Sequence, residues 1–246
     1  MSFENRMAAI GRTTEWHESH QKYEVQRRNQ QNEKLVQAEL QHANAELQID
    51  ELSVQIDNES FTDLSVFIDP IDGTRAFMVG APTWSNLIGL THKNQPTLGL
   101  ANFPVLNKFY FNDQKKSYLI NNKKNILATS KESDLRKCKV IGHLHESLFQ
   151  KKYNKKIKKV ISMVSYFGAA TFDALNFCLL AEGKVEAVIE TNLKPFDIVP
   201  VIPIIEKAGG IVTTWDNRSA IQGGNILATS NKKIHNKILK ILESSS

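Results

Sequence analysis

A short apolar run that ends at two carboxylates restricts most strongly how this chain folds. The run, Leu64–Ile68, has the length and composition of a β-strand buried in a sheet, and Asp69-Pro70 ends it. Asp72 follows three residues after Asp69, and Gly73 and Thr74 come next, at the expected start of a helix. The sequence therefore predicts a strand that delivers two carboxylates, a glycine and a hydroxyl in succession.

These residue types suit a site for a cation and a phosphate. Hard cations such as Mg²⁺ take carboxylate and carbonyl oxygens as ligands. A helix N-terminus offers free amides to a phosphate, and glycine allows the phosphate close to the backbone. The alternative is an ordinary Asp-Pro, Asp-Gly turn after a strand.

The downstream sequence alternates between strand and helix patterns. Four short apolar segments with Asn- and Pro-marked turns predict an antiparallel sheet: Asn86–Leu90, Thr97–Asn102, Lys108–Phe111 and Ser117–Ile120. Helical spacing follows at Thr171–Ala181, with Gly183 as its stop, and strand patterns recur at Val185–Ile189 and Ile211–Trp215. The class is α/β or α+β.

An apolar helix is expected over 198–208. Asp197 precedes it as a good N-cap residue, and Gly209-Gly210 closes it. Pro200 lies in the first turn, where proline is tolerated, whereas Pro203 lies deeper and is expected to kink the helix.

Composition excludes several classes of protein. The chain has 246 residues, 41% of them hydrophobic, and a formal charge of +5, which suits one large or two small globular domains. Cys138 and Cys178 form neither a metal-ligand pair nor a disulfide framework. We find no signal-peptide pattern, and no apolar stretch approaches the ~20 residues that span a bilayer. We expect a soluble, cytoplasmic protein.

The composition changes near residue 50. Residues 15–50 are polar, with one narrow apolar stripe at helical spacing: Val36, Leu40, Ala43 and Leu47. We interpret this stripe as an amphipathic helix that packs on the body. The alternative is a short coiled-coil seam for a partner.

Two blocks of sequence in register carry a family signature. The first is VFIDPIDGTRAFMVGAPTWSNLIGL, and the second is ALNFCLLAEGKVEAVIETNLKPFDIVPVIPIIEKAGGIVTTWDN. With the tail GGNILATSNKKIHNKIL, they resemble the inositol monophosphatase family of Mg²⁺-dependent phosphatases over roughly residues 50 to 241. The resemblance implies an α/β (α+β) fold, a layered α-β-α-β-α sandwich of the inositol monophosphatase/sugar phosphatase type. Residues 1–48 are then an atypical polar helical segment and 49–246 the phosphatase body, divided into a β-rich metal-site part (49–125) and a C-terminal α/β part (126–246).

The resemblance also implies a set of metal ligands. Asp69 would bridge two metals, with the Ile71 carbonyl on one of them, and Asp72 and Asp197 would hold the second. The family's Gly-Glu-Glu, about 20 residues upstream, is replaced here by Ile49-Asp50-Glu51. We expect Glu51 to be the ligand, with Glu59 or no ligand as the alternatives. The family's Lys-Ser-Asp/Ser-Pro-Val-Thr loop has no counterpart in residues 11–48.

For the substrate, the resemblance implies backbone amides of Gly73 and Thr74 on the phosphate. The Thr74 hydroxyl would help to orient the attacking water, so that Glu51, Asp72 and Thr74 form the catalytic set. Glu190 would contact polar groups of the substrate, although it could instead be a surface carboxylate at a strand end. Two or three Mg²⁺ ions would activate the water for in-line attack on the phosphate monoester of a small metabolite. A homodimer is implied as well.

The substrate branch is suggested by a few residues. Arg75-Ala76-Phe77, Leu193–Asp197 and the Thr-x-Trp after Gly209-Gly210 resemble the histidinol-phosphate phosphatase branch, which belongs to histidine biosynthesis. The alternatives are inositol 1-phosphate and 3′-phosphoadenosine-type nucleotides. A different class of function is a relative with an impaired metal site that acts as a binding or scaffold protein through residues 1–48.

A dense lysine run lies between the two blocks. Its members are Lys151, Lys152, Lys155, Lys156, Lys158 and Lys159. We interpret it as a solvated face that could steer anionic substrates. Because only Tyr153 lies within it as a stacking aromatic, we do not expect nucleic acid as the primary partner. The lack of a long apolar stretch argues against a membrane as well.

Overall fold

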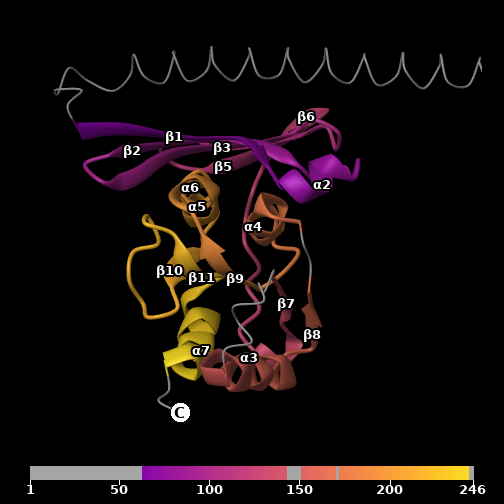
Figure 1. Ribbon diagram of the computed structural model, residues 1–246, viewed down its shortest axis with the longest axis vertical. Helices are drawn as coiled ribbons and strands as arrows, with labels where there is room; N and C mark the ends of the chain where they lie inside the picture. Colours follow the sequence, from indigo (N-terminus) through magenta and orange to yellow (C-terminus); the bar gives the residue numbers. More distant parts are fainter. Residues whose placement is uncertain (1–62, 143–150, 170–171, 244–246) are drawn as a thin grey trace, which may run out of the picture. The chain divides into compact units, whose positions relative to one another are not determined.

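The first sheet is built from six strands that pair in the order of the chain (Figure 1). The computed structural model describes residues 63–142, 151–169 and 172–243, all of them in the unit Asn58–Ser246. Every pairing in this sheet is antiparallel. The strands are β1 (Leu64–Asp72), β2 (Ser85–His92), β3 (Gln95–Phe103), β4 (Lys108–Asn112), β5 (Ser117–Asn121) and β6 (Lys123–Ile126). Asn94, Asn107 and Asn122 take the left-handed φ that its tight turns need.

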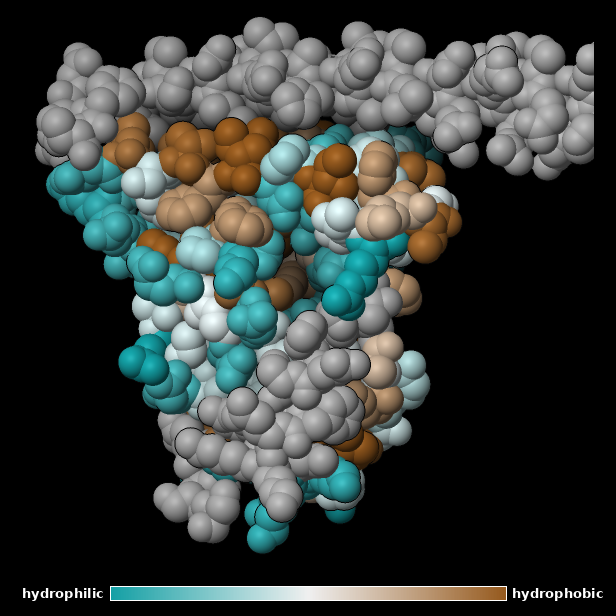
Figure 2. All heavy atoms as spheres, viewed as in Figure 1, coloured by the Kyte–Doolittle hydropathy of each residue, from teal (hydrophilic) through white to brown (hydrophobic). Residues whose placement is uncertain are grey.

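The predicted antiparallel sheet is confirmed at β2 to β5, but the expectation that the first strand is buried is wrong. Val66 and Ile68 are 57% and 59% exposed. The physical reason is that Val66 and Ile68, two apart on the strand, point to one face of the sheet, and no described helix covers that face, since α5 and α6 pack on the other. Figure 2 shows hydrophobic side chains gathered over β1 and over α2 (Thr74–Met78), the short helix that follows it.

The second sheet is mixed and has the order β10-β11-β9-β7-β8. Two parallel pairings join β7 to β8 and to β9, and the remaining pairings are antiparallel. Its strands are β7 (Lys139–Ile141), β8 (Tyr166–Gly168), β9 (Ala187–Leu193), β10 (Ile211–Thr214) and β11 (Gly224–Thr229). The strand expected at Val185–Ile189 therefore begins two residues later, after the turn that contains Gly183.

Helices separate the sheets and cover the second one (Figure 1). Between the sheets lie α4 (Ala174–Ala181), α5 (Pro195–Ile198) and α6 (Val201–Lys207); beyond the second sheet lie α3 (Lys151–Met163) and α7 (Lys232–Glu243). A 3₁₀ turn, η2 (Leu135–Lys137), precedes β7. The layer between the sheets and the layer beyond the second sheet enclose separate apolar cores. This arrangement confirms the layered α/β fold class.

The helix expected over 198–208 is two helices, α5 and α6, that break at Val199-Pro200. Val199 is the residue four before Pro203, whose ring excludes a helical hydrogen bond to the Val199 carbonyl. The expected disruption by Pro203 therefore occurs one turn before it, as a complete break with Pro200 as the N-cap of α6. The break allows a close approach to the first sheet, where a Cβ on Gly99 would collide with the Pro200 carbonyl.

Several expectations fall outside the described residues. They are the predicted helix with the stripe Val36, Leu40, Ala43 and Leu47, the proposed ligand Glu51 and its alternative Glu59. Within the described ranges, no helix combines the length and the apolar character needed to cross a bilayer.

Candidate metal and phosphate site

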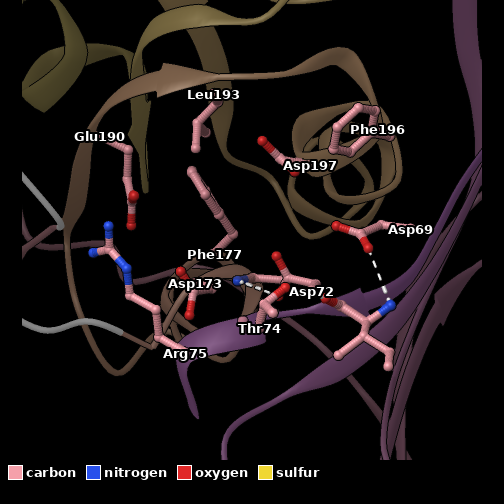
Figure 3. A pocket seen from close by; sticks show the side chains of 13 residues that line it. Asp69, Asp72, Thr74, Arg75, Asp173, Phe177, Glu190, Leu193, Phe196 and Asp197 are labelled. Atoms are coloured by element: carbon pink, nitrogen blue, oxygen red, sulfur yellow. Dashed lines mark hydrogen bonds between the residues drawn. The ribbon is translucent and has the colours of Figure 1, made fainter. Parts of the chain in front are cut away.

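Three carboxylates from two distant parts of the chain meet at the end of β1. Asp69 and Asp72 come from β1, and Asp197 comes from α5 (Figure 3). One carboxylate oxygen of each lies within 4.8 Å of the others. Asp72 is buried, whereas Asp69 and Asp197 are half-buried. Carboxylate oxygens at this spacing can coordinate one cation or bridge two.

A β-bulge brings the two β1 carboxylates together. Residues three apart on a regular strand point to opposite faces of the sheet. Here Asp69 pairs with Leu87 and Asp72 with Ser85, so three steps along β1 match two steps along β2. The extra residue reverses the alternation, and both carboxylates reach the same side. Pro70 lies inside the bulge, a position where a strand tolerates proline.

Asp72 is held from two sides. Its Oδ2 accepts a hydrogen bond from Ser85 Oγ at 2.9 Å and from the Ala174 backbone amide at 3.0 Å. Burial, with smaller contributions from Asp173 and Asp69, raises the pKa of Asp72 to about 8. A buried carboxylate in this environment is stabilised when a cation joins it.

Asp197 lies within the first turn of α5, not before a helix as its N-cap. Its Oδ2 accepts the Lys194 backbone amide at 2.6 Å, so Lys194 is the N-cap. The N-cap expectation is wrong because Pro195 starts a separate short helix two residues earlier. Burial raises the pKa of Asp197 to about 6, helped by repulsion from Asp69 and Asp173.

The turn after the bulge forms the neighbouring wall. Gly73 takes a φ of 74°, which favours glycine, and begins α2. The Thr74 hydroxyl donates to the Ile71 carbonyl at 3.1 Å, and the Ile71 amide donates to Asp69 Oδ1 at the same distance. Two hydrogen bonds through Ile71 thus fix the six-residue turn from Asp69 to Thr74.

These groups open into one cavity of about 340 Å³. This volume falls within the range of small-molecule sites. Every site residue expected from the sequence that lies in the described ranges lines it: Asp69, Ile71, Asp72, Gly73, Thr74, Glu190 and Asp197. The structure therefore brings these residues to one place.

Glu190 is a wall of this cavity and not a surface carboxylate. It lies on β9, is 2% exposed and accepts a hydrogen bond from Asn176 Nδ2 at 2.8 Å. Figure 3 shows Arg75, from α2, directed toward Glu190. The side of the cavity away from Asp197 therefore presents both a carboxylate and a guanidinium.

Sequence reasoning missed Asp173. It lines the cavity immediately before α4, with φ 48° and ψ −128°, a conformation that L-residues rarely adopt. Its carboxylate lies over Gly73, where Oδ2 would be 2.9 Å from an added Cβ. An aspartate just before a helix usually indicates an N-cap, so its sequence signal is that of a structural residue. Here its side chain makes no capping hydrogen bond.

Comparison with known proteins supports the resemblance seen in the sequence. The sequence model of the inositol monophosphatase family matches residues 6–246. The bifunctional phosphatase IMPL2 of Arabidopsis thaliana is 31% identical over 195 residues, which are 75% of this chain and 55% of that protein. This chain therefore spans about half the length of that relative. The histidinol-phosphatase of Mycobacterium tuberculosis is 25% identical over 73% of this chain and 70% of its own length.

A solved structure shares the fold. An inositol monophosphatase from Zymomonas mobilis superposes with a TM-score of 0.67 at 24% identity, over 82% of each chain. Members of the matched family hydrolyse phosphate monoesters and depend on metal ions. The chain belongs to the inositol monophosphatase family.

Proposed function

We propose that this chain is a Mg²⁺-dependent phosphomonoesterase whose metal site is formed by Asp69, Asp72 and Asp197. The observation that carries the proposal is the meeting of their three carboxylates within 4.8 Å. The donor set fits the ion, because Mg²⁺ prefers oxygen ligands and these carboxylates repel one another without a cation. The carbonyl of Ile71 and the carboxylate of Glu51 complete the proposed ligands for two or three ions.

The residues of this chain orient the groups around the reacting phosphate. Ser85 and the Ala174 amide fix the Asp72 carboxylate, and the contact with Ile71 fixes the Thr74 hydroxyl. In the proposal, Thr74 and Glu51 position the attacking water, and the backbone amides of Gly73 and Thr74 bind the phosphate. When bound, Mg²⁺ would lower the pKa of the attacking water and neutralise the charge that develops on the leaving oxygen.

We propose histidinol phosphate as the substrate, which places the protein in histidine biosynthesis. Two carboxylates besides the proposed ligands, Asp173 and Glu190, line the cavity. Carboxylates in the cavity wall favour a substrate that carries an ammonium group. The histidinol-phosphatase relative supports the same choice. We also propose a homodimer located in the cytoplasm.

One observation favours a second candidate. Arg75 lines the same cavity, and a guanidinium suits a leaving group that carries a further phosphate. A 3′-phosphoadenosine-type nucleotide has such a group. Inositol 1-phosphate, which is neutral apart from its phosphate, would use neither the cationic nor the anionic wall fully.

A substrate panel separates these candidates. We expect kcat/KM of the Mg²⁺-loaded chain to be highest for histidinol phosphate among histidinol phosphate, inositol 1-phosphate and 3′-phosphoadenosine 5′-phosphate. In Glu190→Gln, the side-chain oxygen can still accept the Asn176 hydrogen bond, but the charge is lost. We expect this variant to lose at least about tenfold in kcat/KM for histidinol phosphate, the value of one charged contact, and less for inositol 1-phosphate.

Arg75→Gln is the matched control. It should reduce kcat/KM only for the nucleotide. Equal losses for all three substrates in Glu190→Gln would show that Glu190 supports the site without recognising the leaving group. A preference of the native chain for the nucleotide would replace the first candidate by the second.

A further inference from the structure

The positive charge of this chain is concentrated on α3 and α7, which pack side by side beyond the second sheet (Figure 1). α3 has six lysines and no acidic residue, and α7 has four lysines and one acidic residue, Glu243. The two helices thus contain ten of the 31 Lys and Arg residues but only one of the 26 acidic residues. The remaining 21 cationic and 25 acidic residues give a formal charge of −4, so the net charge of +5 comes entirely from these helices.

The lysines point outward because the apolar sides of both helices are buried. Ile157 and Val160 of α3 share one core with Ile234 and Ile238 of α7. On the opposite side of each helix, the lysines are exposed to solvent: Lys155, Lys158 and Lys159 on α3, and Lys232, Lys233, Lys237 and Lys240 on α7. Positions three and four apart lie on the same side of a helix, so each helix presents one lysine face.

Two contacts fix the helices in place. Lys156 Nζ of α3 donates to the Leu242 carbonyl in the last turn of α7 at 2.6 Å. Lys237 Nζ of α7 donates to the Ser133 carbonyl at 2.7 Å, which ties α7 to the segment before β7. None of the ion pairs among the described residues involves a lysine of α3 or α7. The two faces therefore form a fixed surface whose charge no described carboxylate neutralises.

We propose that the lysine faces of α3 and α7 bind the phosphate backbone of a nucleic-acid duplex. A helix of 13 residues is about 20 Å long. The seven exposed lysines along that length give about one positive charge per 3 Å, the same order as the roughly one negative charge per 1.7 Å of a duplex. The structure thus extends the lysine run of α3, which alone suggests a solvated face, by a second row on α7.

Other polyanions fit this surface less well. An interfacial membrane helix needs an apolar face for the bilayer, and the apolar faces of α3 and α7 are buried in the protein. Single strands are bound through stacked aromatic rings, and Tyr153 is the only Phe, Tyr or Trp in the two helices. Contacts from lysine to phosphate carry no base information, so binding should be independent of sequence.

The surface is separate from the cavity. α4 and α5, which border the cavity, lie on one side of the second sheet, and α3 and α7 lie on the other (Figure 1). Duplex binding and phosphate release can therefore be measured independently. If the test of one proposal fails, the other proposal is unaffected.

The test is fluorescence anisotropy of the full chain with labelled DNA and RNA duplexes of about 20 base pairs. Their ends carry hydroxyls, so the cavity finds no phosphate monoester. We expect a Kd between about 10⁻⁶ and 10⁻⁴ M near physiological salt, with log affinity falling linearly with log salt concentration. The triple variant Lys155→Glu, Lys158→Glu, Lys159→Glu should weaken binding at least about tenfold and lower the salt slope by roughly 2 to 3.

A matched control changes the charge equally elsewhere. Lys115→Glu, Lys116→Glu, Lys123→Glu alters exposed lysines of the first sheet and its turn, and should weaken binding less than about threefold. Both triple variants should keep the phosphate release of the native chain. No duplex binding near 50 mM salt, equal losses in both variants, or binding only to vesicles containing phosphatidylserine would each overturn the proposal.

Discussion

The backbone amide of Ala174 donates a hydrogen bond to Asp72 Oδ2 across 3.0 Å, although the two residues are 102 apart in the chain. The contact joins the end of β1 to the start of α4. Ser85 Oγ uses the same carboxylate oxygen, at 2.9 Å. Within the described residues, the other oxygen of Asp72 makes no hydrogen bond, and it is the one we expect to face the cation.

Replacing Asp72 by Asn should separate folding from metal binding. The Asn oxygen can keep both hydrogen bonds, and Asn avoids the cost of protonating the carboxylate on folding, so the free energy of unfolding without Mg²⁺ should be equal to the native value or about 1 kcal/mol higher. The stabilisation that Mg²⁺ gives the native chain in thermal unfolding should disappear. Ser85→Ala is the control: it should cost about 1 kcal/mol and keep the Mg²⁺ response. An unchanged Mg²⁺ response in Asp72→Asn would refute the ligand assignment.

Mg²⁺ binding should release protons. Burial raises the pKa of Asp72 to about 8 and that of Asp197 to about 6 without a cation. The folded chain then holds protons that the unfolded chain loses near pH 4, so metal-free stability should fall as the pH rises from about 4 to about 8. Mg²⁺ must displace these protons, and its affinity should increase at least about tenfold between pH 6 and pH 8.

Calorimetry in two buffers of different ionisation enthalpy measures this release directly. At pH 7 we expect close to one proton released for each chain that binds Mg²⁺, because Asp72 is still protonated there and Asp197 is largely ionised. An affinity independent of pH, with no proton release, would show that the carboxylates are ionised before the metal binds.

The backbone of Asp173 should be strained. Its φ of 48° with ψ of −128° is a conformation suited to glycine. Asp173→Gly should therefore raise the free energy of unfolding by about 1 kcal/mol, whereas Asp173→Asn, which keeps the side-chain shape, should change it little. Urea unfolding measures both. A less stable glycine variant would mean that contacts of the Asp173 side chain outweigh the strain.

His235 should make the fold sensitive to acid. Its two ring nitrogens lie 3.1 Å from Thr213 Oγ1 and 2.9 Å from Thr229 Oγ1, and burial lowers its pKa to about 4. The unfolded chain binds this proton near pH 6.5, so the histidine should remove stability as the pH falls from about 6.5 to about 4, by on the order of 3 kcal/mol in full. His235→Gln cannot titrate and should lose less between pH 7 and pH 4.5. Parallel pH profiles of the two proteins would contradict this.

Gly99 should be intolerant of a side chain. A Cβ there would collide with the Pro200 carbonyl at the break between α5 and α6. Gly99→Ala should cost about 3 kcal/mol in chemical unfolding, because the layer that carries Asp197 must move. Gly80→Ala, which has a left-handed φ but nothing within 4 Å, should cost about 1 kcal/mol. Similar costs for both would mean that the layers separate easily.

Local signals predicted the first sheet well. The strands from β2 to β5 alternate or cluster their apolar residues, and Asn94, Asn107 and Asn122 mark turns that need a positive φ. The parallel strands β7 and β8 have three residues each, which is too short to produce a readable pattern. Their pairing depends on contacts that are distant in sequence.

The sequence motif predicted which residues form the site, but it did not predict how they are arranged. A spacing of three along a strand predicts opposite faces for Asp69 and Asp72, and only the pairing of β1 with β2 reveals the bulge that unites them. Asp173 has the sequence appearance of a helix cap, and the sequence alone left a surface carboxylate as the alternative for Glu190. Their positions in the cavity wall depend on how α4 and β9 pack, which no local pattern records.

Phosphate release from histidinol phosphate tests the central claim most directly, with and without Mg²⁺, for the full chain and for Asp72→Asn. We predict turnover that requires Mg²⁺ and that Asp72→Asn lowers at least about a thousandfold. Turnover that is independent of Mg²⁺ would contradict the metal site. If the chain showed no turnover of any phosphate monoester and no Mg²⁺ binding by calorimetry, the assignment as an enzyme would be contradicted. A binding or scaffold role through residues 1–48 would take its place.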